Sequence, residues 1–411
     1  MKLDPTVREI LAGIGQSHGT PCYVYFIDHI LAQIYRVMGA FDNRFTISYA
    51  VKANPNPILL NHLKESISLL DVSSAGEMSE ALTLGYKPEQ LSFTGPAKRE
   101  FELIQATQAG SVEMICESEQ ELDRLNQIAE QFATRIPILI RINPDKLPKT
   151  FGVNMAARPS QFGIDQVEVS RVLERLTQWT NLDFAGFHIY AGTNCLNEDA
   201  ISENFANYIE LFLNFSEKHQ LHPRKLIFGS GFGIPYFQQQ QPLDLKKLAN
   251  LINPAIDDLH TSPFLKNAQC VLETGRFLVG QNGYFVTSVI SEKTSRGVQI
   301  RLCDGGMNNH LGACGLLGMV IRRNYPIWNL NNPTGPLREY MLVGPLCTTI
   351  DTIAERIELP EIKTGDTIAI GSSGAYGLTA SPVRFISHPQ PNEFIVSGTG
   401  LNTQITDVSQ N

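Results

Sequence analysis

The sequence predicts an α/β fold: a (β/α)8 TIM-like barrel with a second, all-β domain after it. Eight strand-like runs alternate with helical stretches over roughly residues 28–275, which is the pattern of a closed parallel barrel. After Gly275 the pattern changes to short strands separated by turns, with few convincing helices. A chain of 411 residues, 43% hydrophobic and 18% charged, is long enough for one large and one smaller domain.

The barrel strands are expected at FTISYAVK, SLLDV, LSFTG, VEMIC, IPILIRIN, FAGFHIY, KLIFGSG and QCVLETG. Helical stretches such as NPILLNHLKE, SEQELDRLNQIAEQ and LDLKKLANLI follow them, and HILAQIYRVMGAF precedes the first strand. The earlier strand CYVYFI comes before that helix, so we expect it to join GYFVTSVI, REYMLVG and NEFIVSG in the second domain. The expected domains are therefore residues 28–275, and residues 1–27 together with 276–411.

Charge and composition exclude several classes of partner. The net charge is -8 and no run of Lys or Arg occurs, so neither nucleic acid nor an anionic membrane is expected as a partner. The charged N-terminus and the lack of about 18 consecutive apolar residues argue against a signal peptide or a spanning helix, and we expect a cytoplasmic protein. Seven cysteines without a CxxC pattern predict reduced thiols, with neither disulfides nor a metal site.

A lysine ends the first barrel strand. Alternation along FTISYAVK turns Thr46, Ser48, Ala50 and Lys52 to one side, and this small, polar row suits the barrel interior. Lys52 then lies at the carboxyl-end mouth, where barrel active sites are built. A partly desolvated amine in that place can form a Schiff base with a carbonyl compound. From this segment alone, a surface lysine that ends a strand is an equal alternative.

A glycine-rich turn follows the apolar strand KLIF. Gly229, Ser230 and Gly231 lie at its carboxyl end, and glycines there let backbone amides approach an anion such as a phosphate. The turn matches neither the Walker spacing nor the dinucleotide fingerprint. A plain tight turn is therefore the alternative.

A carboxylate and a guanidinium close the eighth strand. Glu273, Gly275 and Arg276 stand in the run ETGR, which suits a ligand with a basic ring nitrogen and a phosphate. Pyridoxal phosphate has both groups, together with the aldehyde that Lys52 needs. Glu273 would keep the pyridine nitrogen protonated, so that the ring accepts electrons from a carbanion. A surface ion pair is the alternative for this Glu and Arg.

Together these motifs resemble the fold-type III pyridoxal-phosphate decarboxylases, the family of diaminopimelate, ornithine and arginine decarboxylases. The resemblance runs almost end to end through YAVKAN, DVSSAGE, GSGFGIPY, ETGR, DGGMNNH, GPLCTTID and GAYG. It implies an alanine racemase-like barrel, pyridoxal 5'-phosphate as cofactor, and removal of carbon dioxide from the Cα of an L- or D-amino acid. It also implies a homodimer in which GPLC of one subunit completes the site of the other.

The resemblance implies a role for each matching residue. Lys52 would form the Schiff base, Glu273 would contact the ring nitrogen, and Cys347 of GPLC would return a proton to the substrate carbon. The other implied cofactor-binding residues are Gly229, Ser230, Gly231, Gly275, Arg276 and Tyr376, of which Gly231, Arg276 and Tyr376 contact the phosphate. Outside this context, a cysteine or tyrosine at these positions is more often part of the core.

The run HIYAGT departs from the pattern of many relatives. Tyr190 stands where they place a histidine that stacks on the ring, His188 lies two residues earlier, and Thr193 replaces a phosphate-binding Ser. We assign ring stacking to Tyr190, because its larger face carries no titrating charge that would compete for the ring proton. His188 is either a further cofactor contact or a core histidine.

A second departure concerns the substrate. Thr348 follows Cys347 where enzymes for free diamino acids carry an acid that binds the distal ammonium. Losing such a charge-assisted hydrogen bond removes about 1.5 to 3 kcal/mol of discrimination, which argues against a substrate with a cationic tail. Asp304 and Asp351 remain as further substrate-binding candidates, so a diaminopimelate or other free diamino acid decarboxylase is the alternative.

A third departure suggests how the substrate is presented. The runs GACGLLGMVIRRNYPI and GAYGLTASPVRFISHPQPNEF look like the branch associated with exopolysaccharide or aminoglycoside biosynthesis, in which an acyl carrier protein can carry the amino acid. Arg322 and Arg323, with a neutral wall at Thr348, would fit an acyl chain or the phosphate of a carrier arm. Solvated surface arginines are the alternative.

Three other functions are less well supported. By resemblance, a racemase would pair the ring nitrogen with Arg, whereas this chain has Glu273. A Schiff-base aldolase would need only Lys52 and a phosphate loop, and would lack the absorbance of pyridoxal. A noncatalytic regulatory homologue would be expected to have lost Lys52 or Cys347, and both are present.

Overall fold

The computed structural model describes residues 2–237, 239–316 and 323–409. They form two compact units. The barrel unit comprises Gln33–Gly233 and Pro242–Gly275, and the β unit comprises Met1–Ala32, Ile234–Gln241 and Arg276–Asn411. Within the described ranges, no helix is both long and apolar enough to cross a membrane.

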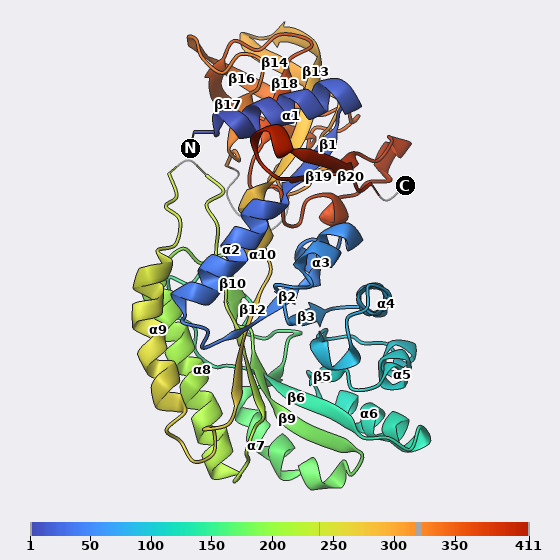
Figure 1. Cartoon of the computed structure of the whole chain (residues 1–411), viewed down its shortest axis with the longest axis vertical. Helices are drawn as coiled ribbons and strands as arrows, with labels where there is room; N and C mark the ends of the chain where they lie inside the picture. The colour runs from blue at the N-terminus through green and yellow to red at the C-terminus, as the bar shows by residue number, and fades with distance from the viewer. Residues whose placement is uncertain (1, 238, 317–322, 410–411) are drawn as a thin grey trace. The chain divides into compact units, whose positions relative to one another are not determined.

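The barrel unit contains the predicted eight-stranded parallel barrel (Figure 1). The strands follow the order β5-β4-β3-β2-β12-β11-β9-β6, and pairing of β5 with β6 closes the ring. Their bounds are β2 Thr46–Ala50, β3 Leu69–Val72, β4 Leu91–Phe93, β5 Glu113–Cys116, β6 Ile136–Asn143, β9 Leu182–Ile189, β11 Lys225–Gly229 and β12 Gln269–Thr274. The short strand β8 (Ile164–Asp165) pairs in parallel with the end of β6.

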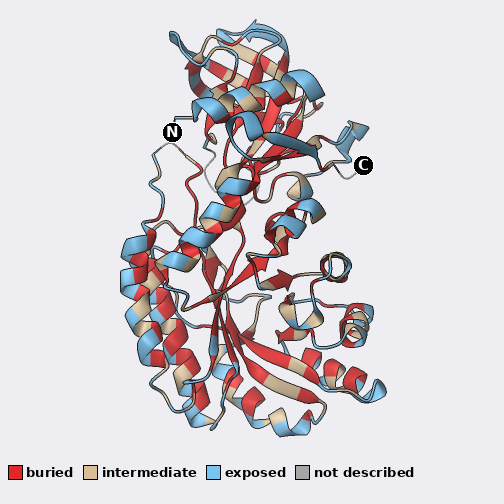
Figure 2. Ribbon diagram, viewed as in Figure 1, coloured by how far each residue is buried: buried red, intermediate tan, exposed pale blue. Residues whose placement is uncertain are grey.

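Helices follow the strands as the sequence periodicity predicts, with buried faces toward the strands and exposed faces outward (Figure 2). Their bounds are α2 Ile27–Ala40, α3 Pro57–Leu63, α4 Ala75–Thr83, α5 Glu100–Ala109, α6 Glu119–Gln131, α7 Gln166–Glu174, α8 Glu198–Lys218 and α9 Leu245–Leu259. Side chains of Ser74, Ser118 and Asp244 cap α4, α6 and α9 by accepting bonds from free backbone amides.

The interior of the barrel is layered. An apolar layer is formed by Ile115, Leu139, Ala185, Ile227 and Val271. Since side chains alternate along a strand, the residue two positions further on also points inward, nearer the carboxyl-end mouth. On several strands that residue is charged or polar, so the apolar layer forms the floor under a buried polar site.

The β unit is built on a nine-stranded mixed sheet, as predicted for the second domain. Its strands are β1 Cys22–Phe26, β13 Gly283–Ser295, β14 Val298–Cys303, β15 Ile327–Asn329, β16 Leu337–Val343, β17 Thr352–Pro360, β18 Thr367–Ile370, β19 Asn392–Ser397 and β20 Gln404–Asp407. The leading strand β1 pairs with β13 and β19. Helix α1 (Pro5–His18), which begins at the Asp4 cap, was not expected from the sequence.

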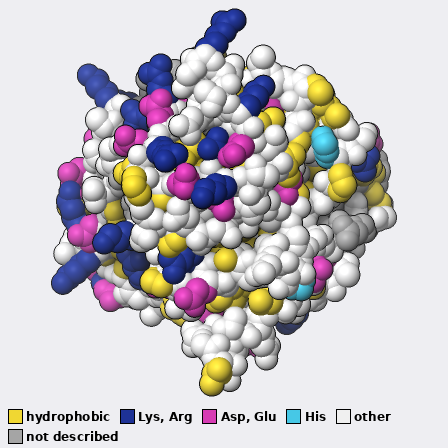
Figure 3. Space-filling view, turned by 90° about the horizontal axis from the view of Figure 1, so that it is seen from above, with side chains coloured by type: hydrophobic (Ala, Val, Ile, Leu, Met, Phe, Trp, Pro, Cys, Tyr) yellow, Lys and Arg dark blue, Asp and Glu magenta, His cyan; other side chains and the backbone are white. Residues whose placement is uncertain are grey.

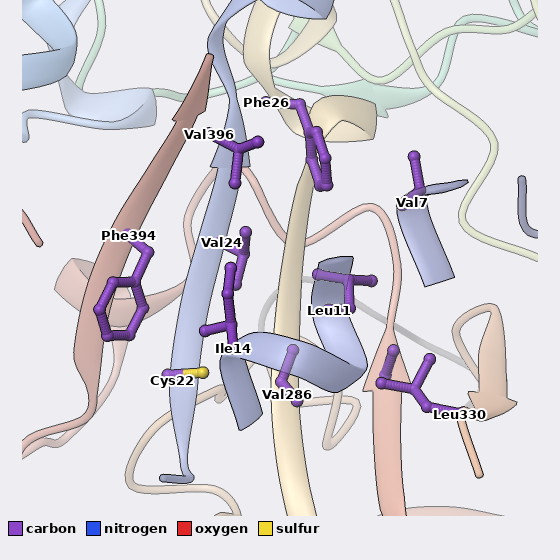
Figure 4. Close-up of a cluster of buried hydrophobic side chains, with 11 residues drawn as sticks. Val7, Leu11, Ile14, Cys22, Val24, Phe26, Val286, Leu330, Phe394 and Val396 are labelled. Atoms are coloured by element: carbon purple, nitrogen blue, oxygen red, sulfur yellow. The ribbon is translucent and has the colours of Figure 1, made fainter. Parts of the chain in front are cut away.

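Helix α1 packs its apolar face on this sheet (Figure 4). Its buried residues Val7, Leu11 and Ile14 recur at the spacing of one helix face, and they meet Val24 and Val286 from the sheet. The charged residues near the start of the chain therefore form the outer face of a core helix. On the molecular face shown in Figure 3, basic and acidic side chains are interspersed.

Candidate active site

Lys52 lies directly after β2, in the short 3-10 turn Val51–Ala53. Its Nζ is 3.1 Å from Asp71 Oδ2 and 3.9 Å from Glu273 Oε1. Both carboxylates are buried, whereas 39% of the Lys52 side chain is exposed. The structure thus brings the predicted lysine and glutamate together and leaves the amine accessible from the mouth of the barrel.

Asp71 is a member of this site that the sequence analysis did not identify. It is the inward residue of β3, two positions after the floor contact Leu69, and it accepts a hydrogen bond from Thr94. Burial raises the pKa of Asp71, and the nearby charge of Glu273 adds to this, while Lys52 opposes it. The Lys52 ammonium acts against these two effects and favours the ionised form of the carboxyl.

Glu273 is held by a histidine. His188 Nε2 lies 2.8 Å from Glu273 Oε2, and both side chains are buried. Burial lowers the pKa of His188 to about 3, and the charge of Arg141 contributes. The imidazole is therefore neutral, and we assign its single proton to Nε2, where it can be donated to the carboxylate.

A buried ion pair adjoins the histidine. Arg141 Nη1 lies 3.0 and 3.1 Å from the two oxygens of Glu117. Glu117 also accepts bonds from the amides of Gly95 and Gly163, so its charge is well compensated. Neither member of the pair was predicted, although Arg141 is the one charged residue in the apolar strand IPILIRIN.

The glycine-rich turn packs against the segment that follows β9. The amide of Cys195 donates to Gly231 O at 2.9 Å, and the amide of Gly233 donates to Cys195 O at 2.8 Å. Gly231 has φ +65°, and an added Cβ would lie 2.6 Å from Phe151 Cζ. A glycine is required here for both reasons. In the described part of the chain the Gly231 amide donates no hydrogen bond, so it can bind an anion.

Tyr190 lies against this turn. A Cβ added at Gly229 would lie 2.6 Å from Tyr190 Cγ, so the missing side chain makes room for the aromatic ring. Lys52 Nζ is 6.0 Å from the centroid of that ring. Thr193 follows in the short strand β10 (Gly192–Thr193), which pairs with β7 (Val153–Asn154).

In the β unit, the structure brings Arg276 and Tyr376 together. Arg276 begins α10 (Arg276–Val279), and its guanidinium carbon lies 4.6 Å from the centre of the Tyr376 ring. Its Nη1 donates to the hydroxyl of Tyr236 at 2.6 Å. Tyr376 has φ +53°, an uncommon conformation for a bulky residue. Tyr236, the last residue of GSGFGIPY, was not singled out from the sequence.

The segment that carries Cys347 is anchored by Asp351. The thiol is exposed in the single chain, whereas Asp351 is buried and accepts bonds from the amides of Met307 at 2.6 Å and Leu346 at 2.7 Å. Burial raises the pKa of Asp351. Asp351 thus joins the predicted motifs DGGMNNH and GPLCTTID by hydrogen bonds to one backbone amide of each.

Asp304 also makes contacts within the β unit. It accepts bonds from Thr20 at 2.5 Å, Thr287 at 2.6 Å and the amide of Ser288 at 2.9 Å. These contacts give Asp304 a structural role, and its substrate-binding role stays a prediction. Arg322 lies outside the described residues.

Residues 27–280 match the family model described as "Pyridoxal-dependent decarboxylase, pyridoxal binding domain". The chain belongs to the pyridoxal-dependent decarboxylases. It is therefore a carboxy-lyase that uses pyridoxal phosphate, as predicted, with the predicted barrel fold.

Relatives of known function cover nearly the whole chain. It is 32% identical over 380 residues to L-glutamyl-[BtrI acyl-carrier protein] decarboxylase of Niallia circulans, covering 92% of this chain and 88% of that protein. It is 30% identical over 394 residues to diaminopimelate decarboxylase of Aquifex aeolicus, covering 94% and 89%. The crystal structure of diaminopimelate decarboxylase from Helicobacter pylori complexed with L-lysine matches with a TM-score of 0.83 and 27% identity, covering 96% and 95%.

The residues of this pyridoxal-dependent decarboxylase fit the cofactor. An accessible amine stands 3.9 Å from a buried carboxylate, and the amide of Gly231 donates no hydrogen bond within the described residues. When bound, pyridoxal phosphate supplies an aldehyde and a ring that accepts electrons. In the described residues, no group of three or more His, Cys, Asp or Glu side chains is arranged to hold a metal ion.

Proposed function

We propose that this decarboxylase acts on an α-amino acid whose side chain is attached to an acyl carrier protein, with a glutamyl group as the first substrate to test. The observation that carries the proposal is Thr348, a neutral and partly exposed residue beside the exposed Cys347. A neutral side chain there provides no counter-charge for a cationic tail. The similarity to a decarboxylase of a carrier-bound glutamyl group supports the same substrate class.

We propose that the barrel residues hold the cofactor and keep its ring charged. Lys52 would hold the aldehyde carbon through Nζ, and Glu273 would hold a proton at the ring nitrogen. The bound cofactor would then supply an electron-accepting ring that favours loss of the α-carboxyl group as carbon dioxide. Tyr190 would provide a stacking face for the ring, and His188 would hold Glu273 through their hydrogen bond. In this proposal Gly231, Arg276 and Tyr376 contact the phosphate and Thr193 takes the place of a phosphate-binding Ser, while Gly229, Ser230 and Gly275 are further cofactor-binding residues.

We propose that Cys347 donates the proton that replaces the carboxyl group on the substrate carbon. An exposed thiol is poorly suited to controlled proton transfer, because bulk water competes with it. The exposure of Cys347 in the single chain therefore supports a homodimer in which the GPLC segment of one subunit is covered by the other. The cytoplasmic location stays a prediction from the sequence.

The test is a comparison of substrates with one variant. Purified holoenzyme is incubated with glutamyl-loaded carrier protein, free glutamate and free diaminopimelate, and product formation is followed by mass spectrometry. We expect turnover of the loaded carrier protein and weak turnover of the free amino acids. Thr348→Asp should lower activity on the loaded carrier and raise activity on diaminopimelate, while Thr349→Asp, at the exposed neighbouring position, serves as the matched charge control.

The alternative is a decarboxylase of free diaminopimelate. It is favoured by the 30% identity to the Aquifex enzyme over 94% of the chain. Turnover of free diaminopimelate equal to or faster than that of the loaded carrier protein would establish this alternative and overturn the assignment based on Thr348. A racemase is disfavoured by Glu273, and release of carbon dioxide separates the two reactions.

A further inference from the structure

A histidine and a glutamate face each other at the mouth of the barrel. His188 Nε2 is 2.8 Å from Glu273 Oε2, and the two side chains are 0% and 2% exposed. Their strands, β9 and β12, both pair with β11. Because neither side chain reaches water, solvent cannot replace this hydrogen bond if it is lost. Removing the histidine donor would therefore leave Glu273 Oε2 without that hydrogen bond.

In this hydrogen bond His188 is the donor and Glu273 is the acceptor. Burial lowers the pKa of His188 to about 3, so the ring is neutral and carries one proton. The carboxylate can only accept, so this proton is on Nε2. The other ring nitrogen, Nδ1, has no hydrogen-bond partner within the described residues. His188 thus gives Glu273 one hydrogen bond without a positive charge.

Arg141 stands directly opposite His188 in the register of β6 and β9. Its guanidinium donates hydrogen bonds to Glu117, and the residue is 4% exposed. A fixed cation beside the imidazole opposes a second proton, while Asp71 and Glu117 act in the opposite direction. The ion pair therefore favours the neutral ring and adds little net charge of its own.

We propose that His188 is a positioning residue, which fixes the Glu273 side chain through Oε2 and leaves Oε1 available to the cofactor. An imidazolium in its place would neutralise the carboxylate and weaken its hold on the ring proton. An apolar residue would free Oε2 to turn toward Lys52, whose Nζ is now 3.9 Å from Oε1. This inference rests on the proposed role of Glu273.

The experiment uses holoenzyme reconstituted with pyridoxal phosphate labelled with 15N in the ring. The ring nitrogen signal is recorded for the wild type, His188→Leu and His188→Gln, and cofactor affinity is measured by fluorescence titration. The Leu variant lacks the donor, whereas the Gln amide retains one. We expect the Leu variant to shift the signal toward the unprotonated ring and to bind the cofactor about ten- to hundredfold more weakly. The Gln variant should restore most of both properties.

A second measurement does not depend on whether the Leu variant folds. In wild-type holoenzyme labelled with 15N-histidine, we expect His188 to show one protonated and one unprotonated nitrogen across the working pH range. In Arg141→Met/Glu117→Gln, which removes the buried pair together, protonation of both nitrogens should begin at a higher pH. An imidazolium at His188 in the wild type would overturn the inference.

The variant Glu273→Gln tests the proposed role of Glu273 separately from the inference about His188. If that variant keeps the ring nitrogen protonated, the role of Glu273 fails and His188 has no carboxylate to position. If Glu273→Gln loses ring protonation but a folded His188→Leu keeps it at wild-type affinity, only the inference about His188 fails.

Discussion

Replacement of Asp71 by Asn tests whether this carboxylate keeps the reactive lysine charged. The substitution preserves the shape of the side chain and an acceptor for Thr94, but it removes the negative charge 3.1 Å from Lys52 Nζ. Two unit charges at that separation interact by about 5 kcal/mol at an effective dielectric constant near 20, and by about 1.3 kcal/mol in water. Because 39% of the Lys52 side chain is exposed, we expect about 1 to 3 kcal/mol.

That free energy predicts the pH dependence of lysine reactivity. Without Asp71 the ammonium form of Lys52 loses stability, so the amine should react with the aldehyde at a pH lower by about 1 to 2 units. The assay incubates apoenzyme with pyridoxal phosphate over a range of pH, fixes the coenzyme with borohydride, and measures the labelled fraction by intact mass. Asp183→Asn removes a carboxylate from an exposed ion pair with Arg224 and serves as the control.

Thermal stability gives an independent check on the same variant. Burial raises the pKa of Asp71 above the ordinary value of 3.8, so folding favours its protonated form. Its contribution to stability is greatest below the ordinary pKa and falls as pH rises toward the raised one. A neutral Asn avoids this pH-dependent loss of stability, and the partly exposed Lys52 can be solvated by water, so the Tm at neutral pH should not decrease.

In the borohydride labelling assay, an unchanged pH midpoint, or one moved to higher pH, would refute the role given to Asp71.

Three further predictions concern single residues. At saturating pyridoxal phosphate, Glu273→Gln should still hold the cofactor but decrease decarboxylation by about 10²- to 10³-fold, as measured by carbon dioxide release. Lys98→Met removes a buried amine 2.5 Å from Glu121 and should lower the free energy of unfolding by about 3 to 5 kcal/mol in urea titrations; adding Glu121→Gln should recover part of this loss. Gly231→Ala places a Cβ 2.6 Å from Phe151 Cζ and should weaken cofactor binding in fluorescence titrations, and unchanged affinity would contradict the role of this turn.

The sequence predicted the barrel because its periodicity is local. Each strand run is short and apolar, each helix has a marked buried face, and the two alternate regularly enough to imply parallel closure. The inward direction of Lys52 followed from the alternation of FTISYAVK. The structure agrees, since Ser48 lies beside Glu273 in the register of β2 and β12. Helix α1 was missed because its charged outer residues obscured the spacing of Val7, Leu11 and Ile14.

The buried polar residues of the site were harder to predict. Asp71 and Arg141 each follow an inward apolar residue by two positions, but an isolated charge in a strand is equally compatible with a strand end or a surface position. Their meaning comes from partners distant in the sequence, such as Lys52 for Asp71 and Glu117 for Arg141. Such pairings depend on the closure of the barrel, so a charged residue that alternates with buried apolar ones is the signal that could have identified them.

The charges at the barrel mouth explain why this site would hold a protonated ring. The three buried carboxylates of Asp71, Glu117 and Glu273 outnumber the cationic groups of Lys52 and Arg141 beside them, and Glu77 adds a further negative charge near Asp71 and Lys52. A buried, uncompensated negative charge is unfavourable, because the surroundings cannot solvate it as water does. A proton on the ring nitrogen would provide the missing positive charge beside Glu273. The same electrostatics that make the cofactor an electron acceptor would then stabilise its binding, and a neutral analogue that cannot be protonated at that position should bind more weakly.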